Sequence, residues 1–513
     1  MLAQARTFTI EGLHTRSVTV EVDVRRGLPA FTIVGLADAA VREARDRVRA
    51  AILNSGYEFP ALHITANLAP GDVPKAGPGI DLALACALLA ASGQLPPERL
   101  PGHALFGELS LDGQLRPCRG TLAVAQATRE AGLSTLVLAV ERAREAALVE
   151  RLDVAGVRDL NGAVRVLCGG PCDPPPPRSR EHEHERRRAA AAGEPDLREV
   201  RGQGHAVQAL IVAAAGAHNL LLSGPPGTGK TMLAQRLPSI LPALSRAEAI
   251  DVTRIHSIVG GLHDDELVRR RPFRAPHHSV TTAGLIGGAR RGWVGEVVLA
   301  HHGVLFLDEL SEFARPTLEA LRQPLEDGRV AIVRAQHACV YPARFMLVGA
   351  TNPCPCGYAG EVERCRCSEA ELARHRRRLS GPLLDRLDLL VRLERPSAAE
   401  QREAPARTSA QARELVRLAR ERQAARLREE PVCVNAHLDA RLLRRHLALD
   451  ERGERMLRRI QEQRLLSARG QHRLLRVART AADLEGSRRT GERHVAAALA
   501  SRMEVGLAPG RAA

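Results

Sequence analysis

The chain has 513 residues, of which 44% are hydrophobic and 26% are charged, so its length suggests about three domains with ordinary cores. It has ten cysteines, no secretory signal and no apolar stretch long enough for a membrane helix. These features argue against a disulfide-rich secreted protein and a membrane-spanning one, and they favour a cytoplasmic protein with no membrane partner. The net charge is +15, and residues 401–513 hold 25 Arg against 14 Asp and Glu. This excess predicts an anionic partner, nucleic acid first, and the alternative is a solvated helical surface in an arginine-rich proteome.

Residues 1–168 alternate strand-like and helix-like patterns, which predicts an α+β domain. Strands are indicated by alternating or β-rich runs, and helices by apolar periodicity that stops at a glycine. The predicted strands are 17–24, 30–36 and 63–70, and the predicted helices are 37–56 and 80–93.

A four-proline run and blocks of charge interrupt this pattern at residues 169–196, which predicts an exposed linker. Strand–loop–helix patterns return over 197–395, and this segment contains most of the candidate catalytic and ligand-binding residues. Residues 396–505 are helical in propensity and rich in Arg, and 506–513 are expected to form a disordered tail.

The sequence GPPGTGKT follows a predicted strand at Leu220–Ser223 and precedes a predicted helix. It matches the phosphate-binding pattern G-x-x-x-x-G-K-[ST] in the required context, which disfavours the alternative of a chance glycine loop. Backbone N–H groups of the turn and the positive end of the helix are expected to face phosphate oxygens. The predicted nucleotide-binding residues are Gly224, Pro225, Pro226, Gly227, Thr228, Gly229, Lys230 and Thr231.

Lys230 is one of only two Lys in a chain with 72 Arg. A planar guanidinium is too wide for a turn of N–H groups, whereas a compact ammonium fits. A Lys at this position, in a chain that otherwise uses Arg, therefore indicates a specific role. Lys230 would reach the β- and γ-phosphates, and the hydroxyl of Thr231 would bind Mg²⁺.

Two further predicted strands deliver polar residues at their ends. The strand within 304–310 ends at Asp308 and Glu309, which would hold Mg²⁺ and polarise the attacking water, respectively, rather than serve as purely structural acids. The strand within 345–352 ends at Asn352, which would orient that water. Arg386 follows a proline-broken turn and could reach the γ-phosphate of a neighbouring subunit.

This order of motifs resembles an AAA+ ATPase, an α/β P-loop core followed by a helical lid. The resemblance implies that Asn352 is the first sensor and Arg386 an arginine finger. It also implies a second sensor in the lid helix predicted at 465–486, with Arg469 as the best match and Arg473 as the fallback. A finger that acts between subunits implies a ring, usually a homohexamer.

Longer motifs resemble the magnesium-chelatase-like ATPases of the ComM/YifB family over nearly the whole chain. They lie at residues 271–288, 292–303, 322–335, 341–357 and 380–390. The resemblance implies a DNA helicase that promotes branch migration when incoming DNA is integrated during natural transformation. The alternative is a chelatase-type remodelling ATPase that acts on a protein partner.

Several residues of the ATPase segment are candidates for contact with single-stranded or branched DNA. A predicted hairpin has β-rich flanks at 330–333 and 339–341 and a polar tip, and its loop could project into a ring pore. The candidate phosphate contacts are Arg271, Arg274, Arg290, Arg291 and Arg334. Trp293 could stack a base or be buried in an interface. His277–His278 and His301–His302 could suggest a metal, but adjacent residues of a strand face opposite ways, so a structural role is expected.

The first domain resembles the proteolytic domain of Lon, a ribosomal S5-type fold, at residues 70–85 and 104–132. The resemblance places Gly79 at the position of the nucleophile and Leu122 at that of the catalytic Lys, so the peptidase dyad is absent. A third hypothesis, an ATP-dependent protease, is therefore disfavoured. Lys75 is expected to have a surface or packing role, and the domain to serve assembly or substrate contact.

Four cysteines form two C-x-C pairs, Cys354 with Cys356 and Cys365 with Cys367. Four thiolates could bind a structural Zn²⁺ and clip the loop that follows Asn352, without a catalytic role. The alternative is four reduced thiols without a metal.

Overall fold

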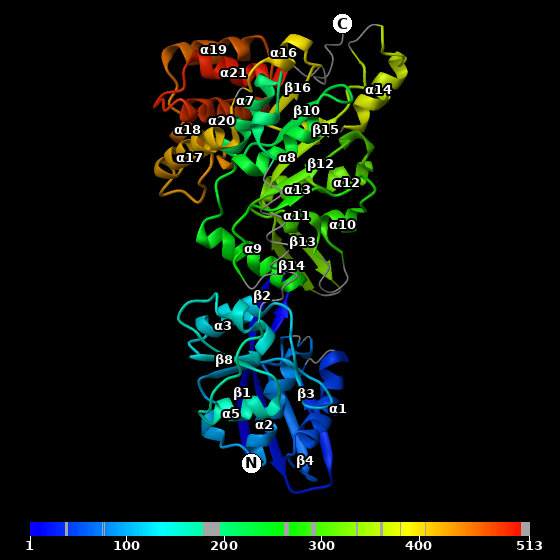
Figure 1. Cartoon of the computed structure of the whole chain (residues 1–513), viewed down its shortest axis with the longest axis vertical. Helices are drawn as coiled ribbons and strands as arrows, with labels where there is room; N and C mark the ends of the chain where they lie inside the picture. Colours follow the sequence, from blue (N-terminus) through cyan, green and yellow to red (C-terminus); the bar gives the residue numbers. More distant parts are fainter. Residues whose placement is uncertain are drawn as a thin grey trace.

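The computed structural model describes the chain except for residues 36–38, 74, 76, 178–194, 261–265, 289–293, 335–336, 360–362, 380, 406 and 504–513. Figure 1 shows two lobes along the long axis, a blue-to-cyan N-terminal lobe and a green-to-red lobe with the rest of the described chain. None of the described helices is long and apolar enough to cross a membrane.

The N-terminal lobe is built on a seven-stranded mixed sheet in the order β3-β4-β2-β1-β5-β8-β9. β2 pairs antiparallel with β1 and β4, and the other neighbours in the sheet are parallel. The strands are β1 (Leu2–Glu11), β2 (His14–Arg25), β3 (Ala30–Val34), β4 (His63–Ala69), β5 (His103–Phe106), β8 (Thr135–Ala139) and β9 (Asp153–Val157), with a small pair β6 (Glu108–Leu109) and β7 (Leu115–Arg116). The helices are α1 (Ala39–Asn54), α2 (Asp81–Ala91), α3 (Thr121–Glu130), α4 (Ala143–Ala146) and α5 (Leu160–Leu167).

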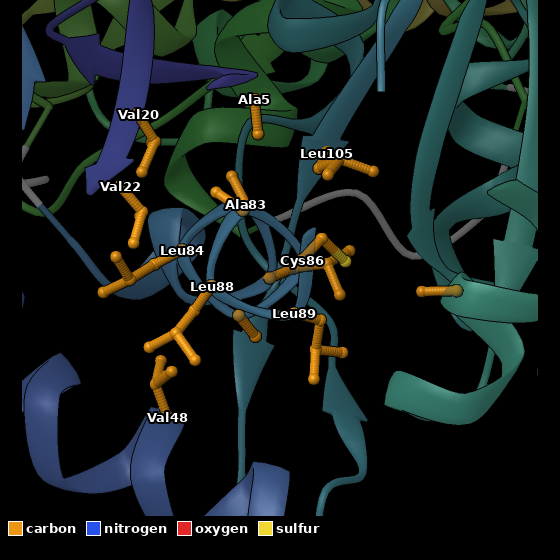
Figure 2. Packing of buried hydrophobic residues seen from close by; sticks show 14 of the residues in the cluster. Ala5, Val20, Val22, Val48, Ala83, Leu84, Cys86, Leu88, Leu89 and Leu105 are labelled. Carbon is orange, nitrogen blue, oxygen red and sulfur yellow. The ribbon is translucent and has the colours of Figure 1, made fainter. Parts of the chain in front are cut away.

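Helix α2 forms the centre of this lobe, because every residue from Asp81 to Ala91 is buried. A helix that is apolar on all sides requires such an environment. Figure 2 looks along α2 and shows Leu88 directed toward Val48 of α1, while Ala83 lies toward the strand residues Ala5 and Val22. The predicted strands and helices of this lobe are confirmed in type and place.

Packing leaves no room for a catalytic side chain at the two positions that the resemblance to Lon assigns to a peptidase dyad. A side chain at Gly79 would overlap the ring of Phe106, and Leu122 is buried in an apolar cluster. Lys75 is fully buried and its Nζ donates to the carbonyl oxygen of Pro70, so of the two expected roles, surface or packing, the structure shows packing. Burial lowers the pKa of Lys75.

The second lobe contains a five-stranded parallel sheet in the order β11-β12-β15-β10-β16. Its strands are β10 (Leu220–Ser223), β11 (Phe273–Arg274), β12 (Val304–Leu307), β15 (Met346–Thr351) and β16 (Leu389–Arg392). The hairpin of β13 (Arg329–Arg334) and β14 (His337–Pro342) confirms the predicted one. The helices of this region are α7 (Gly204–Gly216), α8 (Lys230–Ile240), α9 (Arg246–Val259), α10 (Thr282–Ile286), α11 (Glu296–Leu299), α12 (Arg315–Ala320), α13 (Arg322–Asp327), α14 (Glu369–Arg378) and α15 (Gly381–Leu384).

The last part of the described chain is helical. It comprises α16 (Ala398–Arg402), α17 (Ser409–Arg426), α18 (Ala440–His446), α19 (Glu451–Glu462), α20 (Ala468–Leu484) and α21 (Glu492–Met503). Helices α17 and α20 pack on α7, and apolar residues of these helices share one buried cluster with the sheet. The helical region therefore forms a cap on one side of the parallel sheet (Figure 1).

The two lobes meet at helix α9 and at the β13–β14 hairpin. The backbone N–H of Gly120 donates to Ser257 O at 3.2 Å, and Ser257 also donates to the buried carboxylate of Glu145. The turn between β1 and β2 reaches the hairpin, where Gly12 lies against Tyr341. The N-terminal lobe thus contacts the base of the hairpin that was predicted to approach DNA.

Candidate active site

The predicted phosphate-binding turn lies where β10 ends and α8 begins, as the sequence pattern indicates. The strand is fully buried, which holds the start of the turn in the sheet. Gly227 and Gly229 have φ values of +79° and +87°, in the left-handed region that glycine adopts without steric cost. Gly224 is required for a different reason, because a Cβ there would collide with the carbonyl oxygen of Leu393.

The ammonium of Lys230 lies inside this turn. Its Nζ donates to the carbonyl oxygens of Gly224 and Pro225 at 2.7 and 2.9 Å, and to Asn352 Oδ1 at 3.1 Å. Burial lowers the pKa of Lys230, whereas the neighbouring carboxylates of Asp308 and Glu309 raise it. Lys230, the predicted phosphate ligand, is therefore hydrogen-bonded to Asn352, the predicted first sensor.

The two predicted magnesium ligands are in direct contact. The hydroxyl of Thr231 donates to Asp308 Oδ2 at 2.7 Å, although 77 positions separate the two residues in the sequence. A hydroxyl and a carboxylate are hard oxygen ligands of the kind that Mg²⁺ binds together with substrate phosphates. These residues fit a magnesium ion that accompanies a nucleotide.

Glu309 follows Asp308 at the end of β12, and its backbone has a φ of +50°, which is strained for a residue with a side chain. Its backbone N–H donates to Asp308 Oδ1 at 2.9 Å, and its side chain is 58% exposed. The parallel sheet explains the gathering of these groups, because the carboxyl ends of β10, β12 and β15 lie at one edge. That edge carries the turn, Asp308, Glu309 and Asn352.

His278 is a residue of this site that the sequence did not reveal. It follows β11, the strand beside β12, and its Nδ1 lies 3.4 Å from Glu309 Oε2. The only sequence signal was the His277–His278 pair. The expectation that these two residues lie on a strand and face opposite ways is wrong. The pair is in a loop rather than a strand, and its ring centroids are 4.0 Å apart. His278 can therefore hold the carboxylate of Glu309 in place.

His301 and His302 also lie outside the strands, with ring centroids 3.9 Å apart, so the expectation that they face opposite ways is wrong. His301 Nδ1 accepts the backbone N–H of Arg344 at 3.1 Å, and burial lowers the pKa of His301 to about 2. Asp251 is near enough to complete a set of metal ligands. The positive charges of Arg254 and Arg344 act on the same ring and disfavour a cation, which agrees with a structural role.

Arg386 lies at the opposite, amino edge of the sheet. Its carbonyl oxygen accepts from the Asn219 side chain at 3.1 Å, and Asn219 immediately precedes β10. The four residues of β10 span roughly 13 Å, so the backbone of Arg386, which contacts Asn219, lies at the end of β10 away from the turn of its own chain. Arg386 is 6% exposed and its guanidinium is paired with Glu326.

Arg469 and Arg473 line the same cavity of about 440 Å³ as Arg386. No residue of the phosphate-binding turn lines this cavity. The predicted finger and the predicted second sensor are thus brought together, but away from the nucleotide site of the same chain.

The predicted DNA contacts have different outcomes. The structure disfavours Arg271, because its guanidinium is 12% exposed and donates to Glu248 at 3.0 Å and to His302 O at 2.8 Å. Arg274 donates to both carboxylate oxygens of Glu296, at 2.6 and 2.9 Å, so its charge is compensated. Arg290, Arg291 and Trp293 lie outside the described residues, and Arg334 is placed only as the last residue of β13.

The four predicted cysteines lie together after β15. Cys354 Sγ is 3.3 Å from Cys356 Sγ and 4.0 Å from Cys365 Sγ, and the Sγ atoms of Cys356 and Cys365 are 3.8 Å apart. The Sγ atom of Cys367 completes a group in which all four lie within 4.8 Å of one another. A backbone N–H of Tyr358 lowers the pKa of Cys356 to about 6, whereas burial raises the pKa of Cys354 to about 12.

Comparison with known proteins gives matches along the chain. Family models of the magnesium chelatase subunit ChlI match residues 196–401 and 20–142, and its C-terminal model matches residues 406–502. A protein named YifB from Salmonella typhimurium is 42% identical over 504 residues, which cover 98% of this chain and 97% of that protein. The competence protein ComM of Haemophilus influenzae is 41% identical over 97% of this chain and 96% of its own length.

A more distant match covers less than a third of this chain. The Holliday junction branch migration complex subunit RuvB of Mycobacterium leprae is 30% identical over 168 residues, which are 30% of this chain and 39% of that protein. The full-length matches and the three chelatase models decide the family. This chain belongs to the ComM/YifB family of magnesium-chelatase-like AAA+ ATPases.

Proposed function

We propose that the protein is an ATP-hydrolysing ring motor that acts on DNA, a branch-migration helicase that supports the recombination of incoming DNA in natural transformation. One observation carries the proposal. The turn with Lys230, the Thr231–Asp308 contact, Glu309 and Asn352 share one edge of the sheet, while Arg386 lies at the other edge. A site with this division is complete only when two protomers meet.

The residues of the first edge divide the work of hydrolysis. Lys230 neutralises the β- and γ-phosphates, while Thr231 and Asp308 would hold the Mg²⁺ that supplies further charge neutralisation. Glu309 polarises a water molecule and accepts its proton, while the water oxygen attacks the γ-phosphorus, the bond to the β–γ bridging oxygen breaks, and ADP and inorganic phosphate are formed. Asn352 orients that water and, through its contact with Lys230, links it to the phosphates.

The second edge carries Arg386, the residue that one protomer would contribute to the nucleotide site of the next protomer. In a head-to-tail ring every protomer presents one edge to the next protomer, and such an interface closes into a ring when the rotation fits. Arg386 would then stabilise the charge on the neighbour's γ-phosphate, with Arg469 beside it in the same cavity. We propose a ring on this basis, and a homohexamer because six protomers are usual for the AAA+ ATPases that this chain resembles.

DNA is proposed as the partner because of the basic C-terminal region and the β13–β14 hairpin. Residues 401–513 carry a net charge of +11, and phosphate contacts give sequence-independent binding. The names of two relatives point the same way, since ComM is a competence protein and RuvB a branch migration subunit. We further propose that the chain divides into a Lon-like domain (1–168), a linker (169–196), the AAA+ ATPase core (197–395), the helical lid (396–505) and a disordered tail (506–513).

The test is an ATPase assay with single-stranded, duplex and four-way-junction DNA. We expect the four-way junction to raise turnover most, and the stimulation to fall steeply with added salt because counterions compete for the phosphates. Glu309→Gln serves as the inactive control. A rate that does not change with any DNA would instead favour the alternative, a chelatase-type remodelling ATPase that acts on a protein.

The proposed cofactors are ATP with Mg²⁺ and a structural Zn²⁺ held by Cys354, Cys356, Cys365 and Cys367. Four thiols at these separations suit a closed site without an open coordination position, so this metal would not take part in hydrolysis. Reduced thiols are kept in the cytoplasm, which is the proposed location.

A further inference from the structure

The four-cysteine cluster has the dimensions of a tetrahedral zinc site. A Zn–S bond of about 2.3 Å places the sulfur atoms of a tetrahedron roughly 3.8 Å apart. The observed Sγ–Sγ separations of 3.3, 3.8 and 4.0 Å bracket that value and are too long for a disulfide. The backbone N–H of Ala359 also donates to Cys354 Sγ at 3.2 Å, a contact that orients a metal ligand.

The same loop lies directly against the phosphate-binding turn. Gly357 has a φ of +88°, and its backbone packs so closely on Pro226 that a Cβ at position 357 would lie 2.6 Å from Pro226 Cδ. Position 357 lies between Cys356 and Cys365 in the sequence. A metal that fixes these two cysteines therefore also fixes the backbone that touches the turn.

A second contact strengthens this link. The guanidinium of Arg395 lies 5.4 Å from the centre of the Tyr358 ring, and its Nη2 is 3.5 Å from both Pro226 O and the Tyr358 hydroxyl. On the other side of the loop, Cys354 is fully buried and follows Asn352, which accepts from Lys230, by two residues. The cysteine loop thus touches the nucleotide site at the turn and at the sensor.

We infer that Zn²⁺ bound by these cysteines clamps Gly357 and Tyr358 against Pro226 and thereby sets the affinity for ATP, beyond folding its own loop. This inference rests on the proposed nucleotide site. Without the metal, the turn would spend only part of its time in the binding-competent shape. The apparent Kd for ATP then equals the intrinsic Kd divided by the fraction of molecules in that shape.

The first experiment compares the full-length parent with the double variant Cys365→Ser/Cys367→Ser. Zinc content is measured by elemental analysis, and binding is measured with a fluorescent ATP analogue in the presence of Mg²⁺. We expect about one zinc per parent chain, less zinc in the variant, and about a tenfold rise in Kd for the analogue if the competent fraction falls to a tenth. The matched control is Cys168→Ser/Cys172→Ser, which removes two exposed cysteines outside the cluster and leaves zinc content and Kd unchanged.

The second experiment separates the clamp from the folding of the loop. Gly357→Val keeps all four cysteines but forces a side chain into Pro226, so we expect unchanged zinc content and a Kd raised about tenfold. Loss of zinc in the cysteine variant without a change in Kd would leave a metal site but overturn the clamp. A parent chain that binds the analogue but contains no zinc would overturn the inference, whereas a parent that does not bind the analogue would contradict the proposed function itself.

Discussion

Replacing Arg386 by alanine is expected to lower ATP turnover about 10³-fold or more, because an arginine finger contributes that factor to phosphoryl transfer. Binding of ATP should change little, since Arg386 lies at the far edge of the sheet from the turn of its own chain. Turnover and the binding of a fluorescent ATP analogue measure the two effects. Arg386→Lys should also be strongly impaired, because an ammonium lacks the planar fork that contacts two phosphate oxygens.

The ion pair of Arg386 with Glu326 is compatible with this role. The side chain of Glu326 is 50% exposed, so the pair can open toward a neighbouring protomer. Arg417→Ala is a suitable control, since Arg417 forms exposed ion pairs with Glu414 and Glu421 on α17 and such pairs contribute little. A turnover of Arg386→Ala within a few-fold of the parent would contradict the assignment of the finger.

Replacing Glu309 by glutamine is expected to lower turnover by about 10²–10⁴-fold while ATP still binds, because the amide cannot accept a proton from the attacking water. The change is nearly isosteric and leaves the Thr231–Asp308 contact in place. Rapid-quench measurement of product formation, together with the binding assay, distinguishes this defect from a loss of affinity.

Glu312→Gln is the matched control for Glu309→Gln. Glu312 lies three residues further along, is 48% exposed and pairs with Arg378 rather than with a residue of the turn. Its loss should leave turnover near the parent value, since an exposed ion pair stabilises the fold by at most about 1 kcal/mol. Equal damage from both substitutions would show that the loop after β12, and not the carboxylate of Glu309, is what matters.

The position and shape of the predicted phosphate-binding turn could be predicted because their determinants are local. Glycines at fixed spacing, one Lys and a Thr follow a buried strand, and the structure places each of them as expected. The same holds for Asp308 and Asn352, since parallel strands bring their carboxyl ends to one edge. The role of Glu309, Arg386 and Arg469 in catalysis stays a prediction.

The parts that the sequence did not reveal depend on contacts between distant residues. Strand β1 was missed because its buried positions include Ala3 and Ala5, which give a weak apolar signal. Arg271 was predicted as a candidate DNA contact because its ion pair with Glu248, on α9, joins residues that are distant in the sequence and could not be foreseen from it. His278 reaches Glu309 only because β11 pairs with β12, and no local pattern encodes that pairing.

The most direct test of a site shared between protomers is to mix two inactive variants, Glu309→Gln and Arg386→Ala, and to measure ATP turnover. Each variant supplies the half that the other lacks, so about a quarter of the interfaces in randomly mixed rings should be intact and about a quarter of the parent rate should return. Turnover of the mixture that equals the mean of the two separate variants would contradict the account.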